Sequence, residues 1–205
     1  MVRSFTLSQM APLATRRPGR PAAARREDAL ALGAERFLAG ERVDVKAIAQ
    51  ELGLARATMH RWFGTRDAFI GLVLAALAEE RLTAIRRRTG GTGGRALLDS
   101  FDRFNRELST TDGLRALLAQ EQERALRILT SSGGVVQPRM VATVECLIRE
   151  EIDAGEFAPK VAPESLSYAV VRLAEAFLYN DAIAGIRGDT DRLRDVQAVL
   201  FGVSP

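Results

Sequence analysis

Residues 43–69, VDVKAIAQELGLARATMHRWFGTRDAF, decide the fold of this chain. Ile48 and Leu52 give the first part of the stretch an apolar face at helical spacing, which predicts a short helix. Gly53 is expected to end that helix, because glycine takes a left-handed cap conformation without steric cost. A second short helix is predicted over residues 55–62, so the stretch is expected to form two helices across a tight turn.

The predicted second helix has an inner and an outer face. Met59, Trp62 and Phe63 can face inward against the first helix. A short helix with arginines and small residues outside suits the major groove of DNA, because arginine forms a bidentate bond to guanine and small side chains allow a close approach. Two core helices of an ordinary bundle are the alternative interpretation. The predicted outer residues are Arg56, Ala57, Thr58, His60 and Arg61.

The segment IAQELGLARATMHRWFGTRDAFIGLVL, residues 48–74, resembles the DNA-binding domain of TetR-family transcriptional regulators, whose pattern is roughly IA…AGVS…TLY.HF.SK..L. His60 stands where the family usually has a tyrosine that touches phosphate, Trp62 replaces a histidine, and Arg66 replaces a lysine. The resemblance covers about residues 25–75. The residues in step with the family pattern are Ile48, Ala49, Gly53, Thr58, Phe63 and Phe69.

The apolar spacing along the chain predicts an all-α fold of about nine helices. The resemblance implies that these form an N-terminal three-helix helix-turn-helix domain and a larger C-terminal helical domain for ligand binding and dimerisation. It also implies a homodimer that represses transcription at a palindromic operator in double-stranded DNA and that a small effector releases. The residues expected to contact DNA are Lys46, Arg56, Ala57, Thr58, His60, Arg61 and Arg66.

The net charge of +3 conceals an asymmetry along the chain. Residues 1–66 carry 12 Lys and Arg against 6 Asp and Glu, whereas residues 67–205 carry 17 against 20. A basic head on a slightly acidic body is typical of a DNA-binding domain attached to a separate scaffold. It argues against a dimeric helical adaptor that binds protein only, whereas a DNA-binding protein without a ligand remains an alternative.

Several other classes of protein are not expected. An enzyme is disfavoured, because no nucleophile–histidine–acid set can form away from His60 and no glycine-rich phosphate loop follows a strand. No cofactor is predicted, and one cysteine with one histidine makes a metal site of the familiar zinc type unexpected. No apolar run approaches the ~18 residues of a membrane span, and no signal-peptide core precedes residue 24, so a cytoplasmic protein is expected. Cys146 is expected to be a small buried residue.

We predict three parts along the chain: a basic N-terminal arm over residues 1–22, the helix-turn-helix domain over 23–69, and the ligand-binding and dimerisation domain over 70–205. The arm either follows the DNA backbone or is a solubilising tail. Glycines between residues 90 and 94 predict a flexible break. Outside the opening stretch, helices are expected over residues 23–39, 66–89, 110–130, 138–154 and 161–183. Two more are expected, one between residues 94 and 110 and one at the end of the chain, through Leu193 and Val203.

The last two predicted helices are rich in alanine and aliphatic residues, which suits a four-helix interface between two subunits. Arg172 and Glu175 interrupt an apolar helix and can either pair on its surface or bind a ligand head group. The segment VRLAEAFLYNDAIAG, residues 171–185, resembles the matching helix of family members that control quorum-signal lactone degradation, which implies an acyl-lactone or fatty-acyl effector. Apolar residues expected to line a cavity, unless they are plain core, are Phe101, Phe104, Leu118, Met140, Val144, Tyr168 and Phe177.

Overall fold

The structure, a computed structural model, describes residues 24–180 and 189–204. These residues form ten α-helices and one π-helical segment, with no strand among them. The predicted all-α fold is confirmed, with one α-helix more than the expected nine. The predicted basic arm, residues 1–22, lies outside the described residues.

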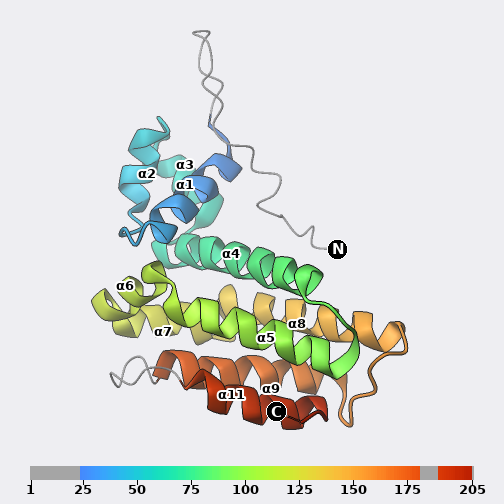
Figure 1. The fold of residues 1–205 in the computed structure, drawn as a ribbon. Coiled ribbons are helices and arrows are strands. Elements are labelled where there is room, and N and C mark those ends of the chain that lie inside the picture. Colours follow the sequence, from blue (N-terminus) through green and yellow to red (C-terminus); the bar gives the residue numbers. More distant parts are fainter. Residues whose placement is uncertain (1–23, 181–188, 205) are drawn as a thin grey trace.

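Three short helices gather at one end of the molecule: α1 (Arg26–Leu38), α2 (Val45–Glu51) and α3 (Arg56–Phe63) (Figure 1). We call this group the reading head. The long helix α4 (Arg66–Arg88) runs beneath it and connects it to the rest of the chain. The observed bounds lie within a few residues of those predicted from the apolar pattern.

Local chemistry explains where these short helices begin and end. The side chain of Asp44 accepts hydrogen bonds from the backbone nitrogens of Lys46 and Ala47, which caps α2. Gly53 then takes a φ of +63°, and Leu54 N donates to Ala49 O at 2.7 Å to close the turn. These contacts set α3 across α2 in a helix-turn-helix arrangement.

The remaining helices form two layers below α4 (Figure 1). The upper layer holds α5 (Gly93–Thr110), α6 (Asp112–Gln120), α7 (Gln122–Thr130) and α8 (Val136–Asp153). The lower layer holds α9 (Pro163–Glu175) and α11 (Thr190–Phe201), and the π-helical segment η2 (Ala176–Asn180) continues α9.

The reading head and the helices below it share one apolar core. A single cluster of buried side chains includes Ile48 and Phe63 of the reading head, Phe69 of α4, and Leu114 and Ile128 of α6 and α7. A second cluster fills the space between α5, α8, α9 and α11. Because the first cluster is continuous, α6 and α7 pack against the same side chains that hold the reading head.

Three sequence-based expectations are corrected by the structure. The predicted single helix over 110–130 is two helices, because Glu121 between them takes φ −139° and ψ 49°. The glycine-rich segment is not a flexible break, because Gly93 is buried and donates its backbone N–H to Glu151 Oε2 at 2.6 Å. A side chain at Gly93 would place its Cβ 2.4 Å from Glu156 O, so the segment is a tightly packed turn. Cys146 is exposed rather than buried.

The predicted helix over residues 161–183 is also interrupted. α9 ends at Glu175 and gives way to the π-helical segment, and residues 181–183 lie outside the described part of the chain. Within the described residues, no helix is both long and apolar enough to cross a membrane, and no group of three acidic, histidine or cysteine residues is placed to hold a metal ion.

Candidate nucleic-acid interface and internal cavity

Helix α3 is held from behind by buried side chains. Met59 and Phe63 are buried, and the Phe63 ring makes an edge contact with Phe69 of α4, with ring centroids 4.8 Å apart. Trp62 is half-buried, and the guanidinium of Arg26 lies 5.0 Å from the centre of the Phe63 ring. The inner face predicted from the sequence is therefore the face that α3 turns toward the core.

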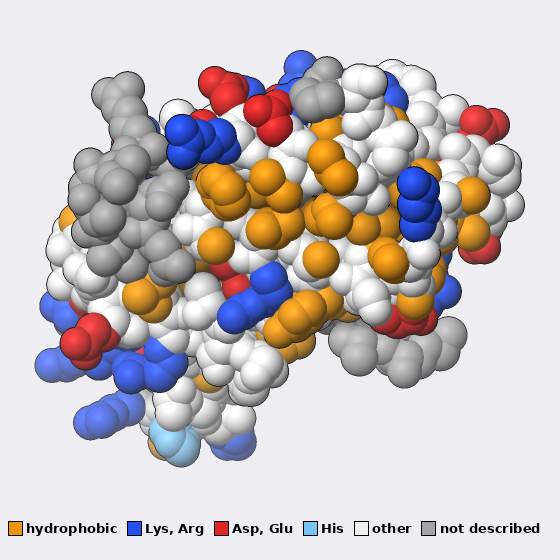
Figure 2. Space-filling view, turned by 90° about the horizontal axis from the view of Figure 1, so that it is seen from below, with side chains coloured by type: hydrophobic (Ala, Val, Ile, Leu, Met, Phe, Trp, Pro, Cys, Tyr) orange, Lys and Arg blue, Asp and Glu red, His pale blue; other side chains and the backbone are white. Residues whose placement is uncertain are grey.

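The opposite face of α3 is open. Arg56 and His60 are exposed one turn apart, and so are Ala57 and Arg61, whereas Thr58 is partly buried at the edge. Figure 2 shows the pale blue histidine among Lys and Arg side chains at one end of the molecule. The arrangement is a short convex helix with guanidinium groups outside, which has the shape and the charge that a DNA groove accepts.

The other two predicted DNA contacts differ in their surroundings. Lys46 is exposed on the first turn of α2, next to the capping Asp44. Arg66 is instead held by Glu121, whose two carboxylate oxygens accept bonds from Arg66 Nη1 at 2.7 Å and Nη2 at 2.8 Å. The guanidinium of Arg66 thus faces the helices below the reading head, and the structure does not present it with the outer residues of α3.

Glu121 is the centre of an ion cluster between the reading head and the helices below it. Besides Arg66, its carboxylate contacts Arg124 Nη1 at 2.5 Å and Arg42 Nε at 3.3 Å. The hydrogen bonds from Arg66 are the main reason that the pKa of Glu121 is lowered to about 2. We call Glu121 with Arg42, Arg66 and Arg124 the junction cluster.

The signal for Glu121 was present in the sequence. It falls on the apolar stripe that runs through Leu114, Leu118, Ala125 and Ile128, where a carboxylate requires partners. Periodicity alone predicts one continuous helix there. The break between α6 and α7 does not change the spacing of the apolar residues, so it cannot be recognised from that spacing. Arg124 is a local partner, three residues on, whereas Arg66 and Arg42 lie 55 and 79 residues away and follow only from the fold.

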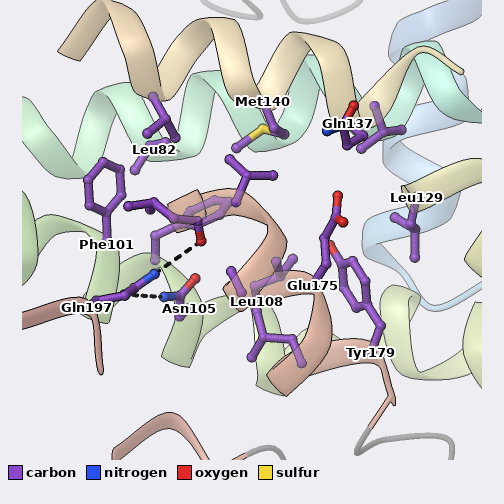
Figure 3. A pocket seen from close by; sticks show the side chains of 17 residues that line it. Leu82, Phe101, Asn105, Leu108, Leu129, Gln137, Met140, Glu175, Tyr179 and Gln197 are labelled. Atoms are coloured by element: carbon purple, nitrogen blue, oxygen red, sulfur yellow. Dashed lines mark hydrogen bonds between the residues drawn. The ribbon is translucent and has the colours of Figure 1, made fainter. Parts of the chain in front are cut away.

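An apolar cavity of about 50 Å³ lies between α5, α8, α9 and η2, and we call it the inner chamber. Polar side chains enter it from several helices (Figure 3). The amide nitrogen of Asn105 donates to Gln197 Oε1 at 3.3 Å, and Gln197 Nε2 donates to Val170 O at 3.4 Å. Buried polar groups that satisfy one another in this way fix the shape of the chamber.

Glu175 and Tyr179 form the other polar end of the inner chamber. Figure 3 shows the Glu175 carboxyl directed into the chamber beside Tyr179. Burial raises the pKa of Glu175 to about 7, although Arg172 Nη1 donates to Glu175 Oε2 at 2.7 Å and opposes the shift. Burial also raises the pKa of the Tyr179 hydroxyl, so Tyr179 is neutral. Near neutral pH the carboxyl of Glu175 can therefore either donate or accept a hydrogen bond.

A larger cavity of about 490 Å³, which we call the outer chamber, adjoins the inner one. It lies between α1, α4, α5 and α6, and Phe37 and Leu38 of α1 form part of its wall. Arg81 and Glu107 pair at 2.5 Å among its lining residues, and Glu80 Oε2 is buried without a hydrogen-bond partner in the described part of the chain. Its size falls within the range of ligand pockets, roughly 300–1,000 Å³.

The structure brings together five of the nine residues predicted to contact a ligand. Phe101, Phe104, Met140, Val144 and Glu175 line the inner chamber, and Phe104 and Met140 also line the outer one. The polar lining residues that the sequence analysis missed interrupt apolar stripes, as Glu121 does. They are Asn105, Gln137 and Gln197.

The other four predicted residues lie elsewhere, for identifiable reasons. Leu118 is buried against the reading head, and Arg172 is exposed beside the chamber, where it also bonds Thr130 O at 3.1 Å. Tyr168 is 51% exposed, because it lies off the buried stripe of α9. Phe177 belongs to the π-helical segment, whose wider turn changes which positions face inward. Tyr179 lines the chamber in its place.

An apolar surface covers the lower layer of the fold. Tyr168 of α9 is 51% exposed, and Val196 and Val199 of α11 are 40% and 75% exposed. Figure 2 shows hydrophobic side chains gathered over this face, which is seen from below. Such a patch on two adjacent helices is typical of a surface that another protein chain covers.

The chain resembles known proteins in both sequence and fold. A family model described as "Tetracyclin repressor-like, C-terminal domain" matches residues 92–202, more than half of the chain. Among solved structures, the chain is similar to the transcriptional repressor QsdR of the TetR family from R. erythropolis, with 28% sequence identity and a TM-score of 0.79. That match covers 86% of this chain and 94% of the other. No curated protein sequence matches.

The two matches point to the same family as the resemblance over residues 48–74. The family model covers α5 to α11, which form most of the inner chamber and the apolar face, and the structural match, at 86% of the chain, extends beyond these helices. Both matches are to DNA-binding transcription factors and not to enzymes, as predicted. The chain therefore belongs to the TetR family of transcriptional regulators.

Proposed function

We propose that this protein is a ligand-responsive repressor that binds a palindromic operator as a homodimer and is released by a small, mostly apolar effector. The observation that carries the proposal is the exposed face of α3, with Arg56 and Arg61 outside and Met59 and Phe63 buried behind. An exposed reading helix on a rigid support can enter the major groove without losing its packing. Residues 23–69 form the DNA-binding unit in this proposal, and residues 70–205 form the effector-binding and dimerisation unit.

The outer face of the reading head divides into two roles. Arg56, Ala57, Thr58 and Arg61 approach base edges, because they lie on or beside the open face of α3. The remaining exposed groups, Lys46 and His60, contact phosphates. Arg66 is assigned to the junction cluster rather than to DNA, since both of its terminal nitrogens are engaged by Glu121.

The apolar face of α9 and α11 is the proposed dimer interface. Two copies joined there would bury Tyr168, Val196 and Val199 in a four-helix arrangement. The proposal requires a two-fold axis through this face that places the two copies of α3 on the same side of the dimer. Successive major grooves lie about 34 Å apart on one side of DNA, so the operator would be palindromic.

The effector proposed for the chambers is a neutral acyl compound such as an acyl-lactone. Its apolar body suits the lining of both chambers, and a carbonyl group can accept a hydrogen bond from protonated Glu175. A free fatty acid, the other compound considered from the sequence, could also accept a hydrogen bond from protonated Glu175, but it would be repelled once Glu175 ionises. The lactone carries no charge and avoids this repulsion, so it is the effector class proposed.

Release from DNA requires the effector to bind better to the form of the dimer that does not fit the operator. The long helix α4 begins at the junction cluster and lines the outer chamber through Leu74 and Leu77, so it connects both regions. Any ligand that moves α4 changes the separation of the two reading heads. By linkage, the operator must weaken effector binding by the same factor.

The test is fluorescence anisotropy of the purified protein on labelled DNA from just upstream of its own gene, with a scrambled duplex as control, across a range of salt concentrations. Tight and sequence-selective binding at physiological salt is expected. Equal binding to both duplexes would favour a DNA-binding protein without sequence preference. Binding to neither, even at low salt, would favour a helical adaptor.

A further inference from the structure

The two chambers share one wall. Six residues line both of them, and a movement of that wall would join the two spaces into one. The shared residues are Phe104, Leu108, Leu129, Val136, Met140 and Tyr179. Methionine and tyrosine side chains in such a wall can change rotamer more readily than backbone can move.

The volumes decide where the bulk of a ligand must lie. The inner chamber, at about 50 Å³, has room for a few water molecules or a small polar group. The outer chamber, at about 490 Å³, is large enough for a drug-sized molecule. An effector whose head reaches Glu175 must therefore place most of its apolar atoms in the outer chamber.

The outer chamber is bounded by the reading head itself. Phe37 and Leu38 are the last two residues of α1, and both line it. Leu38 is 59% exposed, although a leucine gains free energy when apolar atoms cover it. On the facing side, Leu77 and Ala84 of α4 continue the apolar lining. An alkyl chain in this space would be covered by α4 on one side and by α1 on the other.

We propose that the apolar chain of the effector extends from the inner chamber through the outer chamber to Leu38. Only a long chain then contacts the reading head, so the response depends on the length of the chain. This inference rests on the proposed effector-binding function and specifies how that site is used. A short chain fills only the space next to Met140 and Tyr179. A longer chain reaches the end of α1 and contacts the domain that carries α3.

The test measures affinity by isothermal titration calorimetry for two series of probes, N-acyl homoserine lactones and straight-chain primary alcohols, each with short and long chains. Each methylene group buried in the outer chamber should tighten binding about fourfold. In Leu38→Ser, this increment should persist for short chains and be lost for the longest ones. Val161→Ser removes a similarly exposed apolar side chain, 53% exposed, outside both chambers, and should leave every increment unchanged.

The position of the only tryptophan provides a second readout. Trp62 lies on α3 and contacts Phe63, with ring centroids 6.1 Å apart. Long-chain probes should change its emission, whereas short-chain probes that bind should not. In Leu38→Ser, long-chain and short-chain probes should have the same small effect on the emission of Trp62.

The outcomes separate this inference from the proposed effector class. Suppose that the alcohols bind with the long-chain affinity increment that Leu38→Ser abolishes, and that the lactones do not bind. The apolar chain then lies in the outer chamber as inferred, and the proposal of a lactone effector fails. If lactones bind and the long-chain increments in Leu38→Ser equal those of the unaltered protein, the chain does not reach Leu38 and the inference is wrong. Failure of both series to bind would overturn both.

Discussion

Replacing Glu121 with glutamine should destabilise the protein by removing the charge at the centre of the junction cluster. The substitution keeps the size of the side chain, but it replaces one carboxylate oxygen, which accepts a bond from Arg66, with an amide nitrogen that can only donate. It leaves Arg66 and Arg124 next to each other, 2.7 Å and 2.5 Å from the group that now lacks a charge. Arg66 comes from the start of α4 and Arg124 from α7, so the repulsion acts between the helix that follows the reading head and one of the helices below it.

The magnitude follows from the lowered pKa. A pKa of about 2 in place of the ordinary 4.5 corresponds to about 3 kcal/mol in favour of the ionised carboxylate in the folded state. The Glu121 side chain is 15% exposed, so solvent screens it only in part, whereas Arg42 at 64% contributes little. We expect a loss of about 2–3 kcal/mol, which lowers the unfolding midpoint by roughly 4–12 °C for a chain of this length.

Thermal unfolding followed by circular dichroism at several pH values tests this expectation. The pKa of Glu121 is lower in the folded state, so its contribution is complete above about pH 4.5 and is lost as the pH falls toward 2. The gap between the unaltered protein and Glu121→Gln should therefore be largest near pH 6 and fall to less than half by pH 3. Glu123→Gln, an exposed carboxylate in the first turn of α7, is the matched control and should leave the midpoint nearly unchanged.

A difference in midpoint that stays constant between pH 6 and pH 3 would refute the electrostatic reasoning. The stabilisation depends on an ionised Glu121, so the difference has to shrink as Glu121 is protonated. Equal midpoints for all three proteins at pH 6 would show that the cluster does not stabilise the junction. In either case Arg66 would again be available as a DNA contact, as the sequence alone had suggested.

Three further predictions concern separate parts of the molecule. Glu175→Gln should gain stability relative to the unaltered protein as the pH rises from 5 to 8, by up to about 3 kcal/mol. The pKa of Glu175 is raised in the folded state, so its ionisation lowers the free energy of unfolding; unfolding midpoints that change with pH in parallel in the two proteins would contradict this. Gly113→Ala should cost about 1–3 kcal/mol in denaturant unfolding, because its Cβ would lie 2.0 Å from Phe37 O; an unchanged midpoint would show that α1 and α6 yield freely. Arg61→Ala should reduce discrimination between an operator and its altered copies by about 1–3 kcal/mol in anisotropy titrations, whereas Arg66→Ala should lower the unfolding midpoint; the reverse pattern would exchange their roles.

The sequence was sufficient for the reading head because that part of the chain is local. A glycine turn, two short helices and one buried face are all set by residues within 27 positions of one another, from Val43 to Phe69. Met59 and Phe63 are buried, as their spacing predicts, and Arg61 is exposed. Periodicity is reliable where one helix face meets one core.

The junction cluster and the chambers could not be predicted in the same way, because their parts come from distant segments. Arg66 and Glu121 are 55 residues apart, and Asn105 and Gln197 are 92 apart. Each polar residue on an apolar stripe showed that a partner was needed, without showing which one. The π-helical segment adds a further difficulty, since a pattern of period 3.6 assigns Phe177 to the inside.

The contacts between the reading head and the rest of the protein suggest a short route for the effector signal. Gly113 of α6 lies so close to Phe37 of α1 that a methyl group does not fit between them, and Leu38, the next residue, lines the outer chamber. The junction cluster ties the start of α4 to the same region through Glu121. A ligand in the outer chamber would thus push against α1 at a point where α6 leaves it little freedom to yield. Because α4 lines the same chamber and begins at the junction cluster, a ligand that displaces α4 would displace the reading head with it.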